Sequence, residues 1–196
     1  HTGRRIVDGE LTVTDGFWDS CRASWPLRTL LVPRLTGRLL DGFVEHFREA
    51  GWVSRWSAPG AADIMTGTSS DAVFADAALA GIGEFGDFAE LDAYDSCLRN
   101  ATVPSPSPRV GRKGMARSMF TGYADIEAHE GMSWTIDAAI NDAAIAAFSR
   151  YLAVRYPSHG RASEFAANAT WFTARAARFA LMFDEETGFF RGRDRS

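Results

Sequence analysis

Residues 35–50 read LTGRLLDGFVEHFREA and have the apolar spacing of an α-helix. Leu39, Phe43 and Phe47 recur every four residues, so they lie on one face of such a helix. Residues 17–31 show apolar residues at the same helical spacing, and Pro33 separates the two segments. Because proline breaks a helical pattern, the pair of segments predicts an αα-hairpin.

Two further pairs of helical segments follow along the chain. They are residues 71–82 and 88–102, separated by the breaker 83–86, and residues 134–156 and 161–183. Residues 51–67 and the Pro- and Gly-rich stretch from 104 to about 131 have no regular period and predict long loops. Only residues 11–14 suggest a strand. The sequence therefore predicts an all-α fold of about six helices in three hairpins, a helical toroid whose loops build a site at one end.

Composition narrows the class of protein. The 196 residues are 46% hydrophobic with a net charge of −4 and a pI near 5.6, which fits one globular domain with a sizeable core. The mild acidity and the lack of Lys- or Arg-rich runs argue against nucleic acid or an anionic membrane as a partner. No apolar run approaches the roughly 20 residues of a membrane span. The oligomeric state is left open.

The N-terminus and the cysteines allow two smaller inferences. The chain opens with His1 and carries no signal peptide, which indicates a piece of something longer. Cys21 and Cys97 lie on separate predicted helices, so their spacing permits a disulfide but does not require one. Two buried free thiols are the favoured interpretation, because unpaired cysteines tend to lie in cores.

Carboxylates, one of them beside an indole, lie at the starts of predicted helices. Trp18 and Asp19 lie two and three residues after Gly16, and Asp71 follows the hydroxyl residues 68–70. Flat indole faces match the C–H face of a pyranose, and carboxylates accept its hydroxyl protons. This pattern makes carbohydrate chemistry the leading hypothesis. The alternative is structural: Trp18 packs in the core, Asp19 complements a helix dipole and Asp71 serves a capped first turn.

Asp137 and Asn141 are four residues apart on the helix expected from about Ser133, so they share one face. A carboxylate and an amide then lie side by side near the start of that helix. As a general acid, Asp137 would have to be protonated, whereas the helix N-terminus favours the ionised form and burial near Trp134 would oppose it. The alternative is an acidic residue favoured electrostatically in an early turn.

The sequence lacks the motifs of several other kinds of catalytic or binding site. His46, His129 and His159 show no paired spacing of the kind that builds a transition-metal site. Ser-His-Asp catalysis lacks a GxSxG turn. The glycines around Arg112 and Lys113 lack the strand and the GK[ST] ending of a phosphate-binding loop.

The most specific signal is a series of sequence blocks that occur in one order. They are GFWDSCRASWPL (16–27), GWVSRWSAPG (51–60), MTGTSSDAVFADAALAGI (65–82), VGRKGM (110–115), SWTIDAAINDAAIA (133–146) and FDEETGFFRGR (183–193). Together they resemble glycoside hydrolase family 92, the calcium-dependent exo-α-mannosidases. The blocks span nearly the whole chain.

The resemblance implies an enzyme with an N-terminal β-sandwich followed by an (α/α)6 barrel, of which residues 1–196 would be one fragment, about the first half of the barrel. It implies inverting hydrolysis, in which one carboxylic acid protonates the leaving oxygen and a second carboxylate activates water. The substrate would be terminal mannose of a glycan, with α-1,2-linked mannose among the candidates. The host would be bacterial, and the protein extracellular or periplasmic.

The resemblance also implies roles for particular residues. Asp137 would stand at the position of the general acid, and Trp18 and Asp19 would line the −1 sugar subsite. Trp56, Asp71 and Asn141 complete the set expected to bind substrate. Ca²⁺ would contact the O2 and O3 hydroxyls of mannose, consistent with an oxygen-seeking cation. Most calcium ligands and the catalytic base are expected outside residues 1–196.

One departure from the family pattern keeps other functions open. The family's acid is ordinarily Glu in a segment like WxxE, and the matching residue here is Asp137. A shorter acid favours a substrate with a better leaving group, such as a mannosyl phosphate, or a degenerate protein that only binds glycans. A purely structural helical protein would instead bury Trp18, Trp52 and Trp56 in its core. The isolated fragment is expected to be inactive and poorly soluble.

Overall fold

A computed structural model describes residues 9–194, and this part of the chain is mainly helical. The helices are α1 (Phe17–Ser20), α2 (Ser24–Leu31), α3 (Pro33–Ala50), α4 (Ser70–Leu79), α5 (Glu90–Thr102), α6 (Met115–Thr121), α7 (Gly131–Arg155) and α8 (Ala162–Ala176). Two 3₁₀ helices are η1 (Ile82–Phe85) and η2 (Ala177–Met182). Short strands β1 (Asp15–Gly16) and β2 (Trp56–Ser57) pair antiparallel, as do β3 (Phe183–Asp184) and β4 (Phe189–Phe190).

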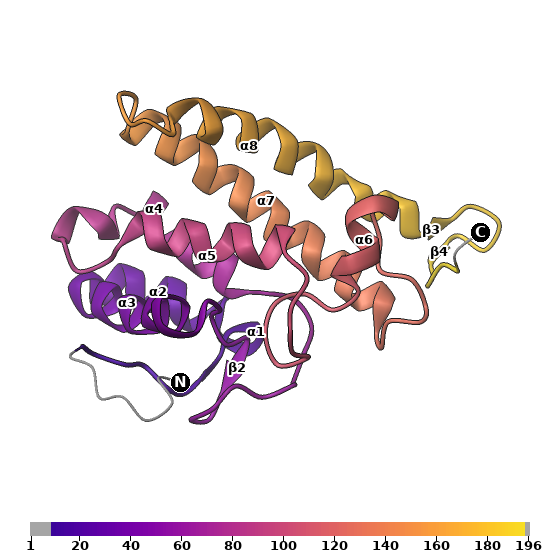
Figure 1. Cartoon of the computed structure of the whole chain (residues 1–196), viewed down its shortest axis with the longest axis horizontal. Helices are drawn as coiled ribbons and strands as arrows, with labels where there is room; N and C mark the ends of the chain where they lie inside the picture. The colour runs from indigo at the N-terminus through magenta and orange to yellow at the C-terminus, as the bar shows by residue number, and fades with distance from the viewer. Residues whose placement is uncertain (1–8, 195–196) are drawn as a thin grey trace.

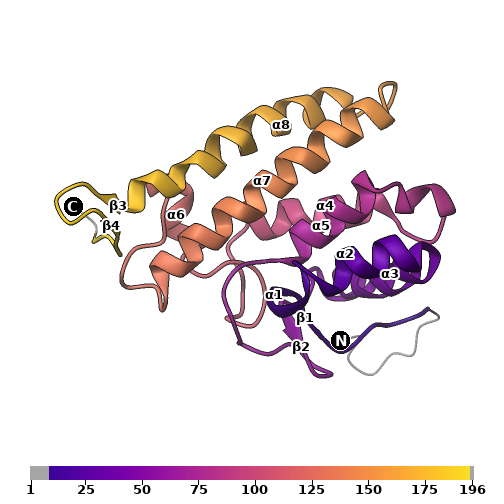
Figure 2. The same ribbon diagram turned by 180° about the vertical axis from the view of Figure 1, so that it is seen from behind.

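The long helices form three hairpins stacked in sequence order. α2 packs on α3, α4 on α5, and α7 on α8, while α4 also contacts α2 and α7 and so joins the three pairs. In Figure 1 the α4–α5 hairpin lies between the α2–α3 hairpin and the long α7–α8 hairpin, and Figure 2 shows the same order from behind. The predicted all-α architecture of three hairpins is confirmed.

Three local predictions differ from the structure. The first helix is divided at residues 21–23 into α1 and α2, because Ala23 takes a non-helical backbone conformation. The strand predicted at 11–14 is absent from the described residues. Antiparallel strand pairing begins instead at the next residue, Asp15, which lies opposite Ser57. Residues 115–121, predicted to be irregular, form α6 between two glycines with positive φ, Gly114 and Gly122.

Aromatic side chains fill the space between the hairpins. Phe17 of α1 packs edge-on against Phe43 of α3 and Phe74 of α4, with ring centroids 4.8 and 6.1 Å apart. Tyr94 of α5 meets Phe148 of α7 at 5.4 Å. All five side chains are buried. The core therefore joins neighbouring hairpins and fixes α1, the N-terminal element of the candidate site, against α3 and α4.

Two questions that the sequence raised concern the state of the cysteines and the presence of a membrane-spanning helix. Cys97 is buried in the core, Cys21 is only partly buried, and both are free thiols, which confirms the free-thiol interpretation. None of the helices described between residues 9 and 194 combines the length and the apolar character that crossing a bilayer requires.

The long loops meet at one end of the helices. Ser54 forms an isolated bridge with Val110, so the loop after α3 lies against the loop after α5. Arg55 donates to the carbonyl of Pro108 at 2.6 Å, and Lys113 pairs with Asp63 at 2.7 Å. This end of the molecule, where α1 and β2 also lie in Figure 1, is where the predicted site residues are found.

Candidate functional site

Asp19 and Trp56 are hydrogen-bonded at the surface where α1 meets β2, and Trp18 precedes Asp19 in α1; we call these three residues the indole–carboxylate platform. The indole nitrogen of Trp56 on β2 donates to Oδ2 of Asp19 on α1 at 2.9 Å, across 37 residues of sequence. Trp18 is 38% exposed and Trp56 is partly buried, whereas Trp52 is buried. The structural alternative required all three indoles in the core, so it fails for Trp18 and Trp56. An exposed indole face beside a carboxylate is the arrangement that sugar binding needs.

Asp137 and Asn141 face the short loop that precedes α4. The Thr66 hydroxyl donates to Oδ2 of Asp137 at 2.5 Å, and the backbone N–H of Thr68 donates to Oδ1 of Asn141 at 2.9 Å. Asp137 is partly buried and Asn141 buried. The expectation that these two side chains share a helix face is therefore met.

Cys21 connects the platform to the neighbourhood of Asp137. The residue directly follows α1, and the pKa of its thiol is lowered slightly by the Ser69 side chain and raised slightly by the charge of Asp137. Burial raises the pKa of the Cys21 thiol, and the nearby Arg22 opposes that rise. The end of α1, the start of α4 and the first turns of α7 thus lie together, although the sequence separates them by 50 residues or more.

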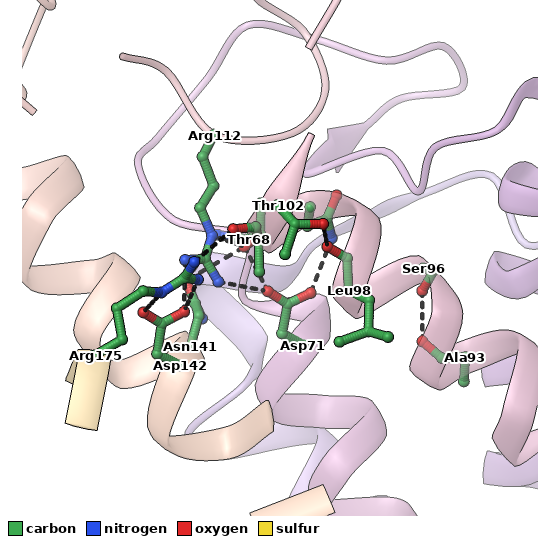
Figure 3. A network of polar contacts seen from close by, with 12 residues as sticks. Thr68, Asp71, Ala93, Ser96, Leu98, Thr102, Arg112, Asn141, Asp142 and Arg175 are labelled. Carbon is green, nitrogen blue, oxygen red and sulfur yellow. Dashed lines mark hydrogen bonds and ion pairs between the residues drawn. The ribbon is translucent and has the colours of Figure 1, made fainter. Parts of the chain in front are cut away.

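A buried network of charges lies behind this loop, as Figure 3 shows. Arg112 pairs with Asp142 at 2.7 Å and with Asp71 at 3.3 Å, and its Nε donates to the Thr68 hydroxyl at 3.3 Å. Arg175 of α8 donates to both oxygens of Asp142. Burying these charges is tolerable because each carboxylate has a guanidinium partner and further hydrogen bonds.

Asp71 belongs to this network and has no exposed surface. Its Oδ2 accepts from the Thr68 hydroxyl at 2.6 Å, and its Oδ1 accepts from the Asn100 amide at 2.8 Å. Burial raises the pKa of Asp71 to about 6, although Arg112 acts in the opposite direction. Direct substrate contact by Asp71 stays a prediction, and the geometry gives its carboxylate an internal role in holding the loop.

Several residues of the site were not singled out from the sequence. Thr66 and Arg112 lie inside quoted sequence blocks without an assigned role, and Thr68 was considered only as one of three hydroxyl residues that could cap a helix. The available signal was compositional: a run of hydroxyl residues directly before a carboxylate, and an arginine between two glycines. Neither signal identifies the partner, because the contacts of Arg112 reach 44 residues back to Thr68 and 30 forward to Asp142.

The described cavities lie elsewhere. One small cavity between α6 and α7 is lined by Lys113, Tyr123, Trp134 and Arg178 among others, and it touches the network through Arg112. None of the six residues predicted as acid or substrate-binding lines it. The platform and Asp137 are therefore not part of this cavity.

The described residues do not by themselves supply a metal centre. Between residues 9 and 194 no three His, Cys, Asp or Glu side chains gather closely enough to hold an ion. The resemblance placed most calcium ligands outside residues 1–196, so calcium stays a prediction. What residues 9–194 do provide is a carboxyl group of Asp137 held by the Thr66 hydroxyl and a carboxylate of Asp19 held by the Trp56 indole.

Comparison with known proteins identifies the family. Residues 5–196 match the model of the glycosyl hydrolase family 92 catalytic domain. The chain belongs to this family. No curated protein matches the sequence. The resemblance seen in the sequence blocks is thus confirmed over nearly the whole length of this family 92 chain.

A solved structure supports the same assignment. The family 92 chain is similar to the structure titled as the family GH92 inverting mannosidase BT2199 from Bacteroides thetaiotaomicron VPI-5482, with 26% sequence identity and a TM-score of 0.83. The match covers 98% of this chain and 25% of that one, so the family 92 chain spans about a quarter of its neighbour's length. The predicted fold class, part of an (α/α)6 toroid, is supported by this match.

Proposed function

We propose that this chain is part of an exo-acting, inverting α-mannosidase that removes terminal mannose from glycans, α-1,2-linked mannose among them. The observation that carries the proposal is the position of Asp137 in a family 92 catalytic domain. Its carboxyl group is partly exposed and held at Oδ2 by Thr66, and Trp56 holds the carboxylate of Asp19 at the surface where α1 meets β2. The similar solved structure is named an inverting mannosidase.

Each group then has a chemical role. Asp137 protonates the glycosidic oxygen as it leaves, and a second carboxylate, from outside residues 1–196, activates the attacking water. The indole of Trp18 covers the C–H face of the mannose ring, and Asp19 accepts a hydrogen bond from a sugar hydroxyl. Trp56 fixes the Asp19 carboxylate through its indole nitrogen. Asn141 sits one turn from Asp137 and orients the same loop.

The proposal extends to the larger protein and its cofactor. We place residues 1–196 in roughly the first half of the barrel of a longer bacterial, extracellular or periplasmic enzyme. Ca²⁺ would engage the O2 and O3 hydroxyls of mannose, as the resemblance implies. Its ligands are expected mainly outside residues 1–196. The isolated fragment would lack the catalytic base and is expected to be inactive.

Asp137 also supports a second candidate function. An aspartate is one methylene shorter than the glutamate typical of the family, which withdraws the carboxyl group by about 1.5 Å, and a misplacement of about 1 Å can cost on the order of 100-fold in rate. A phosphate leaving group needs no protonation by the enzyme, so hydrolysis of a mannosyl phosphate would be spared this loss. A protein that binds mannose without cleaving it is the further alternative.

The test compares two substrates in the full-length protein. Mannose release is measured from an α-1,2-mannobioside and from an α-mannosyl phosphate, with and without a calcium chelator, for wild type, Asp137→Asn and Asp137→Glu. As a mannosidase, the wild type hydrolyses the disaccharide, the chelator abolishes the activity, and Asp137→Asn loses at least about 100-fold. Asp87→Asn, which changes a partly buried carboxylate paired with Arg34, serves as the control and should match wild type.

Each other outcome selects a different function. Cleavage of the phosphate alone, unchanged in Asp137→Asn, would identify a mannosyl-phosphate hydrolase that works without an acid. Binding of mannose with no turnover of either substrate would identify a glycan-binding protein. A faster Asp137→Glu variant would show that the short side chain limits the wild-type enzyme.

A further inference from the structure

We propose that Thr66 is a positioning residue for Asp137: its hydroxyl holds Oδ2 so that Oδ1 is the oxygen that carries the transferred proton. The inference rests on the proposed function, in which Asp137 is the general acid. It adds a residue that selects one of the two carboxyl oxygens.

The hydrogen-bond pattern at Asp137 carries the first step. The Thr66 hydroxyl has a single proton, and it donates that proton to Oδ2 at 2.5 Å. Within residues 9–194, Oδ2 is the only oxygen of Asp137 that accepts a hydrogen bond. When Asp137 is protonated, Oδ2 therefore serves as the acceptor oxygen and the proton resides on Oδ1.

Close packing of the loop against α7 carries the second step. Gly67 has a φ of +75°, and a Cβ added to it would lie 2.9 Å from the Cβ of Asp137. The N–H of the next residue, Thr68, donates to Asn141 one turn further along α7. Three consecutive loop residues therefore contact the same two turns of α7, which fixes the distance between Thr66 and Asp137.

Arg112 connects the 66–68 loop to α7 on the buried side of the site. Its guanidinium contacts the Thr68 hydroxyl of the loop and pairs with Asp142 of α7 at 2.7 Å. Because one buried side chain is tied to the loop and to the helix, neither can shift alone. The Thr66 hydroxyl is thus held in place before any substrate arrives, and little entropy is lost in aligning it.

The chemistry explains why this contact would affect the rate. During proton transfer the Oδ1–H bond breaks, an O–H bond forms on the glycosidic oxygen, and the electron pair stays on the Asp137 carboxylate. The Thr66 hydroxyl then donates to a charged group, and such hydrogen bonds are about twice as strong as neutral ones. Since the hydrogen bond strengthens as the proton leaves, it stabilises the transition state more than the ground state.

The test separates acid positioning from support of the fold. In the full-length protein, Thr66→Val keeps the shape of the side chain and removes the hydroxyl, Thr66→Ser restores it, and Thr170→Val changes an exposed threonine of α8 as the control. We expect Thr66→Val to lower kcat on the α-1,2-mannobioside on the order of 100-fold with little change in KM. Activity on 2,4-dinitrophenyl α-mannoside should stay near wild type, because this leaving group departs unprotonated. Thr66→Ser should recover most of the loss.

Two kinetic results would overturn the inference. An equal loss on both substrates would mean that Thr66 supports the fold of the site, and no loss on either would mean that the hydroxyl is idle. Failure of the proposed function is recognised separately, because Asp137→Asn would then cleave the mannobioside as fast as wild type.

A thermodynamic measurement tests the contact when no substrate is cleaved. The unfolding free energies of Thr66→Val, Asp137→Asn and the double variant form a double-mutant cycle. We expect the two changes to be less than additive, since each removes the same hydrogen bond. Strict additivity would show that Thr66 does not hold Asp137, and the inference would fail.

Discussion

Asp71 shows how a single buried carboxylate contributes to this site. Its two oxygens accept hydrogen bonds from Thr68 and Asn100, and Arg112 lies 3.3 Å away. These contacts connect α4 to α5 and to the loop before α6. A change in the protonation or hydrogen bonding of Asp71 should therefore alter the stability of the contact between residues 66–68 and α7.

The pH dependence of the unfolding free energy should reveal the raised pKa of Asp71. Burial raises its pKa from 3.8 to about 6 on folding. The native state then binds more protons than the unfolded state between pH 4 and 6, so the contribution of Asp71 to stability is full below pH 4 and is lost as the pH rises through 6. We expect the unfolding free energy of wild type, relative to Asp71→Asn, to fall by up to about 3 kcal/mol from pH 4 to 7.

Urea unfolding of the full-length protein at several pH values measures this difference. Asp87→Asn alters a partly buried carboxylate paired with the exposed Arg34, and its stability should run parallel to wild type over the same range. Parallel curves for wild type and Asp71→Asn would contradict the expectation. They would mean that the Arg112 charge fully offsets the burial of Asp71.

The residues of the site were only partly predictable. Asp137 and Asn141 could be placed on one face because helical spacing is a local property of the chain. The pairing of Trp56 with Asp19 and of Arg112 with Asp142 could not be foreseen, since each depends on how separate elements pack. A buried charge is recognisable only once its partner is known.

At the scale of elements, α7 depends on the way it starts. Gly131 opens the helix, and a Cβ at this position would lie 2.2 Å from the carbonyl oxygen of Asp125. Since that neighbour is backbone, the clash cannot be relieved by a side-chain rotation. Any shift at Gly131 is transmitted along the first turns of α7, where Trp134 and Asp137 lie.

A matched pair of glycine substitutions tests this helix start. Gly131→Ala should destabilise the protein by about 1–3 kcal/mol, the usual cost of forcing extra volume into a packed region. Gly160→Ala, in the connection between α7 and α8, meets nothing within 4 Å and should change stability by less than about 1 kcal/mol. Thermal unfolding of both variants makes the comparison. Equal effects would show that the start of α7 can adjust.

The elements themselves were largely predictable, and the exceptions have physical causes. α3 and α5 were predicted because apolar residues recur at helical spacing along one face of each. α6 was missed because glycines were interpreted as loop formers, whereas Gly114 and Gly122 flank a short helix. The break between α1 and α2 was missed because Pro26 was not given weight; proline is tolerated only in the first turn of a helix, and α2 accordingly starts at Ser24.

At the scale of the whole molecule, large apolar side chains remain exposed. Leu30 is 78% exposed, Phe120 83% and Val154 82%. They lie on three different helices, α2, α6 and α7, so more than one face of the hairpin stack is apolar. Leu27, Leu30 and Leu31 are all exposed on the one helix α2, and apolar surface gathered in this way marks an interface that needs covering.

Residues 1–196 on their own should therefore be poorly soluble. We expect the isolated segment to elute as large aggregates in size-exclusion chromatography with light scattering, while the full-length protein elutes in a defined state in the same buffer. The physical reason is association through the exposed apolar faces. A monomeric segment that melts cooperatively would refute this expectation.

The fold class and the number of hairpins could be predicted from the sequence, but the covered and uncovered faces of the helices could not. The order of the sequence blocks indicated family 92, and the hairpin count followed from local periodicity. Which apolar faces stay uncovered could not be foreseen, because helices such as α7 carry apolar residues on several sides and only packing distinguishes a covered side from a bare one.

The buried network also constrains how this sequence can change over generations. Arg112 and Arg175 balance Asp71 and Asp142, so the four positions form one neutral set contributed by separate parts of the chain. A lineage that loses one of these charges leaves its opposite without a partner inside the protein, at a cost of about 3–5 kcal/mol. Such a loss persists only if a second substitution follows nearby. The four positions are therefore inherited together, and a departure at one of them in a homologue should be accompanied by a departure at another.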